Sequence, residues 1–142
     1  MNMNDQAPPL IALLFEKQRL LDHELLRRLE RAGWNNLTRA QSLVFGQLDA
    51  GCTGISQIAE RLGVSRQAVH RTVVELVDSG YLDITADTAS RRTKMLSLTK
   101  KGKRVQADAR SVFAEIEEEL IGTLGVSRVS NLRKVLLSDW GF

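Results

Sequence analysis

The segment ISQIAERLGVSRQAVHRTVVELVDSGYL, residues 55–82, contains two short helical patterns that are joined by a very tight turn. Within it, Ala59, Gly63 and Val69 stand at relative positions 0, +4 and +10. An alanine leaves room for a second helix to cross closely, a glycine takes the left-handed conformation that ends a helix, and the valine packs between the helices. This spacing predicts a helix-turn-helix, a unit that places its second helix in the major groove of DNA.

Helical patterns also precede this unit. Apolar residues recur every three, four or seven positions over residues 10–32, which predicts a long amphipathic helix. Thr38 and Gln41 form a capping-box pattern that opens the next helix. Ser56 is expected to cap the first helix of the helix-turn-helix, and Ser65 the second.

Beyond residue 80 the pattern changes to two short β-favouring runs, YLDIT and KMLSL, separated by the polar segment ADTASRRT. These runs predict a hairpin with a long tip, which would form the wing of a winged helix. Thr99 is expected to cap a further helix. A last helix from about Ser127 is predicted to carry the apolar residues Val129, Leu132, Leu136 and Trp140.

These elements predict a mainly α-helical fold with a small β-hairpin wing, organised as one domain over residues 1–142. A winged helix-turn-helix would occupy residues 38–100, flanked by dimerisation helices over residues 10–33 and 105–142. The flanking helices carry more apolar surface than a small winged domain can cover, and a second copy related by two-fold symmetry would bury it. Packing of the same helices within one chain is the alternative.

Polar side chains are expected to face outward near the start of the second helix of the pair, namely Arg66, Gln67, His70 and Arg71. An arginine can donate two hydrogen bonds to guanine and a glutamine can pair with adenine, while Ser65 and the N–H groups at the helix start suit a phosphate. A solvated surface would explain each residue separately. It explains the pair Arg66 and Arg71 less well, because few acidic partners lie nearby.

The charge distribution points to the same region. The net charge is +3, but residues 61–110 carry 11 basic and five acidic side chains, whereas the segments on both sides are slightly acidic. The hairpin and the start of the following helix hold seven basic residues: Arg91, Arg92, Lys94, Lys100, Lys101, Lys103 and Arg104. We expect the first three to contact DNA from the wing, and the lysine-rich run either to contact phosphates or to be solvated.

Three segments resemble the MarR family of bacterial regulators: LTRAQSLVFGQL (37–48), residues 55–82 and SRRTKMLSLTKKG (90–102). The resemblance extends over about residues 10–140 and implies an obligate homodimer with two recognition helices on a palindromic operator in double-stranded DNA. It also implies that many members release DNA when a small lipophilic or phenolic effector binds. Family members usually have an aspartate before the first wing arginine, and this chain has Ser90 there. Arg91 is therefore expected to be held less firmly, unless Asp87 takes that role.

The sequence predicts neither an enzyme nor a metal or cofactor site, because it holds two histidines, one cysteine and no recognisable catalytic or phosphate-loop motif. Cys52 is expected to be structural rather than a redox sensor. The apolar runs are too short to cross a membrane and the N-terminal segment lacks the features of a secretory signal, so we expect a cytoplasmic protein without membrane contact.

Two functions therefore follow as hypotheses. The first is a sequence-specific DNA-binding transcriptional regulator, a homodimeric repressor that a small molecule releases from DNA. The alternative is a winged-helix interaction module that dimerises without binding DNA. The polar recognition positions favour the first hypothesis, since an apolar or acidic face there would favour the second.

Overall fold

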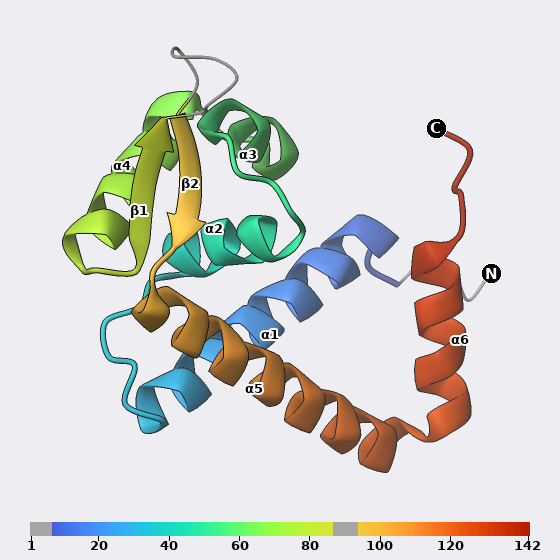
Figure 1. The fold of residues 1–142 in the computed structure, drawn as a ribbon. Coiled ribbons are helices and arrows are strands. Elements are labelled where there is room, and N and C mark those ends of the chain that lie inside the picture. Colours follow the sequence, from blue (N-terminus) through green and yellow to red (C-terminus); the bar gives the residue numbers. More distant parts are fainter. Residues whose placement is uncertain (1–6, 87–93) are drawn as a thin grey trace.

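The fold is mainly helical, with one antiparallel two-stranded sheet (Figure 1). The computed structural model describes residues 7–86 and 94–142. The elements in chain order are α1 (Leu10–Arg31), α2 (Arg39–Asp49), α3 (Ile55–Leu62), α4 (Arg66–Asp78), β1 (Leu82–Ala86), β2 (Lys94–Leu98), α5 (Lys100–Leu124) and α6 (Val126–Leu137). The predicted fold class, helices with a small hairpin wing, is confirmed.

The helix-turn-helix consists of α3 and α4, and its turn follows the predicted spacing. Gly63 ends α3 in the left-handed conformation, with φ of 66°. The N–H of Val64 donates a hydrogen bond of 3.1 Å to the carbonyl oxygen of Ala59, which closes the turn. Ala59 and Val69 are both buried, so α4 crosses directly over α3.

Side-chain caps fix where three helices begin. The hydroxyl oxygens of Thr38, Ser65 and Thr99 each accept a hydrogen bond from the backbone N–H three residues later. Gln41 completes a capping box with Thr38, because its side-chain oxygen accepts from the Thr38 N–H at 3.2 Å. The predictions for the starts of α2, α4 and α5 are therefore confirmed.

Two predictions of helix ends are wrong. Ser56 does not cap α3, because the helix already begins at Ile55 and Gly54 occupies the N-cap position without a side-chain hydrogen bond. Ser56 therefore lies inside the first turn. Trp140 does not lie on α6, which ends at Leu137, although its indole N–H donates a hydrogen bond of 2.9 Å back to a carbonyl oxygen of that helix.

The hairpin is anchored to the helices beneath it. Leu82 pairs with Leu98 across the two strands, and the last described pair places Lys94 at the start of β2. Leu82 and Leu96 are buried in the core of the winged part. The N–H of Leu96 donates a hydrogen bond of 2.9 Å to the carbonyl oxygen of Thr53, between α2 and α3. The base of the wing is thus held at a fixed place beside α3.

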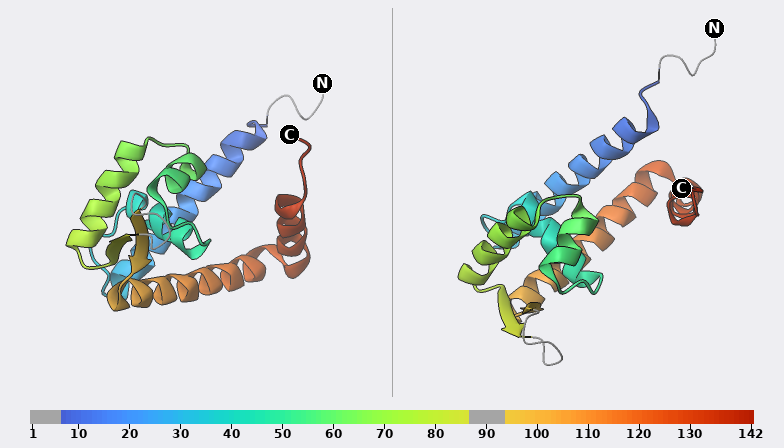
Figure 2. Two further views of the ribbon diagram at one scale, coloured as in Figure 1. Left: turned by 45° about the horizontal axis from the view of Figure 1, so that its top comes forward. Right: turned by 90° about the horizontal axis from the view of Figure 1, so that it is seen from above.

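A second, smaller core joins α1 to α5, where the two helices cross (Figure 2). Its buried members are Leu25, Leu29, Val112 and Ile116. Beside this core the guanidinium of Arg28 donates hydrogen bonds to Glu24 of the same helix and to Glu119 of α5. Hydrogen bonds from Arg27 and Arg28 lower the pKa of Glu24 to about 2.

The N-terminal half of α1, the C-terminal half of α5, and α6 with the residues that follow it have a large exposed apolar surface. Figures 1 and 2 show α6 at the far end of α5, away from the winged part, and none of its residues is buried. We call these side chains the flanking apolar surface: Leu10, Ile11, Leu13, Phe15, Leu20, Leu21, Phe113, Leu120, Leu124, Val126, Leu132, Val135, Leu136, Leu137 and Trp140. None of the helices in the described ranges is long and apolar enough to span a membrane.

Candidate nucleic-acid interface

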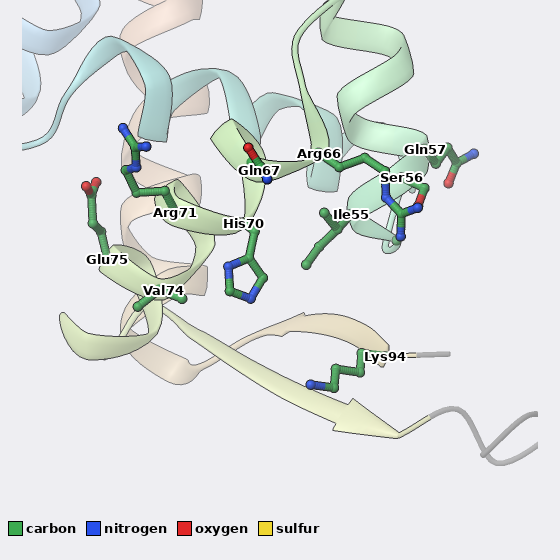
Figure 3. Close-up of a pocket in the computed structure, with 11 residues that line it drawn as sticks. Ile55, Ser56, Gln57, Arg66, Gln67, His70, Arg71, Val74, Glu75 and Lys94 are labelled. Atoms are coloured by element: carbon green, nitrogen blue, oxygen red, sulfur yellow. The ribbon is translucent and has the colours of Figure 1, made fainter. Parts of the chain in front are cut away.

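An open groove of about 980 Å³ lies between the helix-turn-helix and the wing (Figure 3). The start of α3 forms one side, the outer face of α4 forms the floor, and the start of β2 lies opposite. The lining residues are Gly54, Ile55, Ser56, Gln57, Arg66, Gln67, His70, Arg71, Val74, Glu75 and Lys94. We call this feature the α4 groove.

The α-helical repeat explains which side chains of α4 reach the groove. Val69, Val73 and Leu76 are buried against the rest of the winged part, so the opposite face of the helix is turned to solvent. Residues four positions apart lie on the same side of a helix. The exposed face consequently presents two rows, one of Arg66, His70 and Val74, and one of Gln67, Arg71 and Glu75.

The electrostatics of the groove favour an anionic partner. Arg66, Arg71 and Lys94 contribute three positive charges, against one carboxylate, that of Glu75. Within the described part of the chain, none of these three cations lies within 4.0 Å of a carboxylate oxygen. Phosphates can therefore pair with them without first breaking an ion pair.

The groove brings together five of the residues predicted to contact DNA, namely Arg66, Gln67, His70, Arg71 and Lys94. Ser65 lies immediately before α4 and outside the groove lining, where its hydroxyl accepts the capping hydrogen bond of 3.1 Å. Arg91 and Arg92 lie outside the described residues, as does Ser90. The roles of all eight predicted contact residues in DNA binding remain predictions.

Some groove residues do not follow from the pattern used to predict the site. Ser56 and Gln57 line the groove from the first turn of α3, which begins at Ile55, two residues earlier than an N-cap at Ser56 predicts. Glu75 is not among the residues predicted to contact DNA, although its position four residues after Arg71 places it on the same row of α4. Helical periodicity alone is enough to place Glu75 in the groove. Placing the α3 side chains there requires knowing how α3 and α4 cross.

The lysine-rich start of α5 has a different environment. The ammonium group of Lys101 donates a hydrogen bond of 2.7 Å to the carbonyl oxygen of Ser79, and it lies 4.5 Å from the ring centre of Tyr81. Lys101 is therefore bound to the end of α4 rather than solvated. Lys100, Lys103 and Arg104 are not part of the groove lining.

No group of three or more histidine, cysteine and acidic side chains in the described ranges could hold a metal ion. Cys52 is buried, with 4% of its surface exposed, in the core of the winged part. Its neighbours in that core include Ile58 and Leu96. This environment is that of a packed apolar side chain.

The MarR family model matches residues 35–93, which extend from before α2 to the hairpin. The chain belongs to the MarR family. TcaR from Staphylococcus aureus (strain Newman), an HTH-type transcriptional regulator, is 29% identical over 98 residues. That match covers 68% of this chain and 65% of TcaR, slightly less than two thirds of that relative's length.

Solved structures of MarR family proteins share the whole fold. The transcriptional repressor CouR, bound to a 23-mer DNA duplex, is 27% identical with a TM-score of 0.74, and the match covers 96% of this chain and 95% of CouR. Rv2887 from Mycobacterium tuberculosis, in complex with salicylic acid, is 22% identical with a TM-score of 0.70. It is matched over 92% of this chain and 96% of its own, and at this identity it supports the fold alone.

Proposed function

We propose that this MarR family protein is a sequence-specific DNA-binding transcriptional regulator without enzymatic activity, in which α4 reads the major groove. The observation that carries the proposal is the α4 groove. Its outward rows hold polar donors and cations that have no ion-pair partner among the described residues, and Lys94 lies opposite. A helix of 10–12 Å diameter fits the major groove of about 12 Å. The likeness to CouR, whose structure contains a DNA duplex, supports it.

The contacts divide into two classes by chemistry. Arg66, Gln67, His70 and Arg71 occupy the N-terminal half of α4, and we assign them to base edges. Ser65 and the backbone N–H groups at the start of α4 are assigned to a phosphate. Lys94, with Arg91 and Arg92, would extend the interface from the wing to the sugar-phosphate backbone and the adjacent minor groove.

We further propose that two copies associate through the flanking apolar surface. An exposed apolar surface of this extent on three helices is typical of a protein interface. Self-association of one surface requires a two-fold axis, and two-fold symmetry places two copies of α4 on half-sites one helical turn apart. The DNA partner is consequently expected to be a palindromic operator.

The proposed location of the protein follows from the same partner. A regulator that acts on bacterial chromosomal DNA works in the cytoplasm.

Repression with release by a small lipophilic or phenolic effector completes the proposal. A cavity of about 70 Å³ lies between α1, α2 and α5, lined by Leu25, Leu29, Leu37, Phe45, Ala109 and Phe113 among others. It is smaller than the 300 Å³ or more of most ligand pockets, so a ligand has to widen it. Asp49 of α2 pairs with Arg110 of α5 at its edge, so widening would shift the winged part relative to α5. Rv2887, which has the same fold, is itself in complex with salicylic acid, a phenolic compound.

The test is selection of bound sequences from random duplex DNA at moderate salt, with purified protein of measured mass. Enrichment of a palindrome with half-sites about one helical turn apart supports a dimeric regulator. Adding phenolic and other lipophilic compounds to the complex with the selected palindrome then tests effector release. A folded dimer that enriches no sequence would instead favour a winged-helix module that binds protein.

A further inference from the structure

One acidic side chain lies among the cations of the α4 groove. Glu75 is exposed and lines the groove, and one of its carboxylate oxygens accepts a hydrogen bond of 3.3 Å from the side-chain amide of Gln41. Gln41 is only 8% exposed and also accepts from the N–H of Thr38 in the capping box of α2. The carboxylate is therefore held by a side chain that is itself fixed in the core. A freely rotating surface glutamate could turn away from bound DNA, and this one is restrained.

The Glu75 carboxylate retains most of its capacity to accept hydrogen bonds. A carboxylate offers about four acceptor positions, and the described contacts use one of them. In the described ranges no basic group lies within ion-pair distance of it, even though Arg71 precedes it by one helical turn. The Glu75 carboxylate, drawn beside Arg71 in Figure 3, is thus a restrained acceptor without an ion-pair partner among the described residues.

The place of Glu75 on α4 determines what this acceptor can meet. Gln67, Arg71 and Glu75 follow one another at intervals of one turn, about 6 Å, which is close to the height of two stacked base pairs. In the major groove, a carboxylate can accept from the exocyclic amino group of cytosine. Beside a phosphate or a guanine oxygen, the same charge is repelled and loses hydration without compensation.

We propose that Glu75 is a specificity-determining residue, whose carboxylate, positioned by Gln41, accepts a hydrogen bond from a cytosine amino group and disfavours DNA that offers no donor there. This inference rests on the proposed function. It assigns to the row of Gln67, Arg71 and Glu75 three different base preferences, adenine, guanine and cytosine. The repulsive half of the mechanism weakens binding to other sequences, which raises specificity as effectively as an added contact does.

The test compares Glu75→Gln with Asp78→Asn, which removes the same charge from the same helix outside the groove. Binding to the selected operator and to random duplex DNA is measured for each. For Glu75→Gln, the ratio of the two affinities should fall roughly tenfold or more, since one good base contact contributes about that discrimination. Selection from random DNA should also lose a cytosine preference at one position in each half-site. For Asp78→Asn, the ratio should stay at the wild-type value.

A second variant separates position from charge. Glu75→Asp keeps the charge but shortens the side chain by one methylene group, so that it no longer reaches Gln41. Operator affinity should fall while affinity for random DNA stays unchanged.

The inference is overturned if Glu75→Gln strengthens binding to both DNAs as evenly as Asp78→Asn does, or if Glu75→Asp binds the operator like the wild type. If the wild-type protein selects a palindrome without a shared cytosine, this inference alone fails. If it selects nothing, the proposed function fails as well.

Discussion

Gly102 of α5 lies so close to Tyr81 that a Cβ atom at position 102 would overlap the backbone carbonyl oxygen of Tyr81. The same oxygen accepts a hydrogen bond of 3.1 Å from the N–H of Thr99, and the Thr99 hydroxyl donates one of 2.6 Å to the carbonyl oxygen of Gly80. The end of α4 is therefore joined to the start of α5 by direct backbone contact. Movement of α5 would be transmitted to α4 through this junction.

We predict that Gly102→Ala destabilises the protein, because the new methyl group meets rigid backbone rather than a flexible side chain. Overpacking of this kind costs about 1–3 kcal/mol in the free energy of unfolding. Urea denaturation followed by circular dichroism measures the change. Gly122→Ala is the matched control, since nothing lies within 4 Å of a Cβ there, and it should stabilise α5 by about 0.5–1 kcal/mol. Equal stabilities of the two variants would contradict the close contact.

The recognition helix gives a second prediction. Arg71→Ala should weaken operator binding by about tenfold or more, because Arg71 lines the α4 groove. The dimer should stay intact, because Arg71 is exposed and is not part of the flanking apolar surface. Fluorescence anisotropy of labelled operator measures the affinity, and sedimentation measures the mass. Arg61→Ala removes the same charge from α3 outside the groove, where Arg61 donates to Gln47. If both variants lose the same affinity, Arg71 acts only through net charge.

The wing gives a third prediction, which concerns the dependence of binding on salt. Each phosphate that a cation neutralises contributes a slope of about −0.9 to a plot of log affinity against log salt concentration. Lys94→Met should make this slope shallower by about one unit for each Lys94 that contacts a phosphate, and should weaken all sequences similarly. Lys134→Met, on α6, should leave the slope unchanged. A wild-type slope near zero would argue against DNA as the partner.

Local sequence signals predicted the part of the fold that local physics determines. The turn between α3 and α4 depends on Gly63, and the starts of α2, α4 and α5 depend on hydroxyl caps, so each could be predicted from a few neighbouring residues. The prediction that Ser56 caps α3 is wrong because a serine fits both the N-cap position and the first turn of a helix. Gly54 occupies the N-cap position without a side-chain hydrogen bond, so a side-chain cap does not determine where α3 begins.

The candidate site was predictable on the outward face of one helix and at Lys94 of the basic wing. The outward positions of α4 follow from helical periodicity, and they do line one groove. The contact of Gln41 with Glu75 joins residues 34 positions apart, and Lys101 reaches Ser79 across 22 positions. Such contacts depend on how the elements pack, and no spacing rule in the sequence encodes them.

Arg28 is the centre of an ion-pair network between α1 and α5. Its guanidinium lies 2.7 Å from a carboxylate oxygen of Glu24, 2.7 Å from Glu119 and 3.6 Å from Glu115. Hydrogen bonds from Arg27 and Arg28 lower the pKa of Glu24 to about 2, and the hydrogen bond from Arg28 also lowers the pKa of Glu119. Both carboxylates are thus more readily ionised in the folded protein than in the unfolded chain.

The last prediction follows from the sign of these shifts. A carboxylate whose pKa is lower in the folded state stabilises the fold above its ordinary value of 4.5, and this contribution is lost as the pH falls towards 2. Arg28→Met removes the largest cause of the lowered pKa of Glu119 and, after the hydrogen bond from Arg27, the second largest cause for Glu24. Its free energy of unfolding should therefore decrease less between pH 6 and pH 2.5 than that of the wild type. Urea denaturation at each pH measures this difference. Arg31→Met is the control, because Arg31 lies on the same helix and has no ion pair in the described ranges. A wild-type pH profile for Arg28→Met would show that acid sensitivity arises elsewhere.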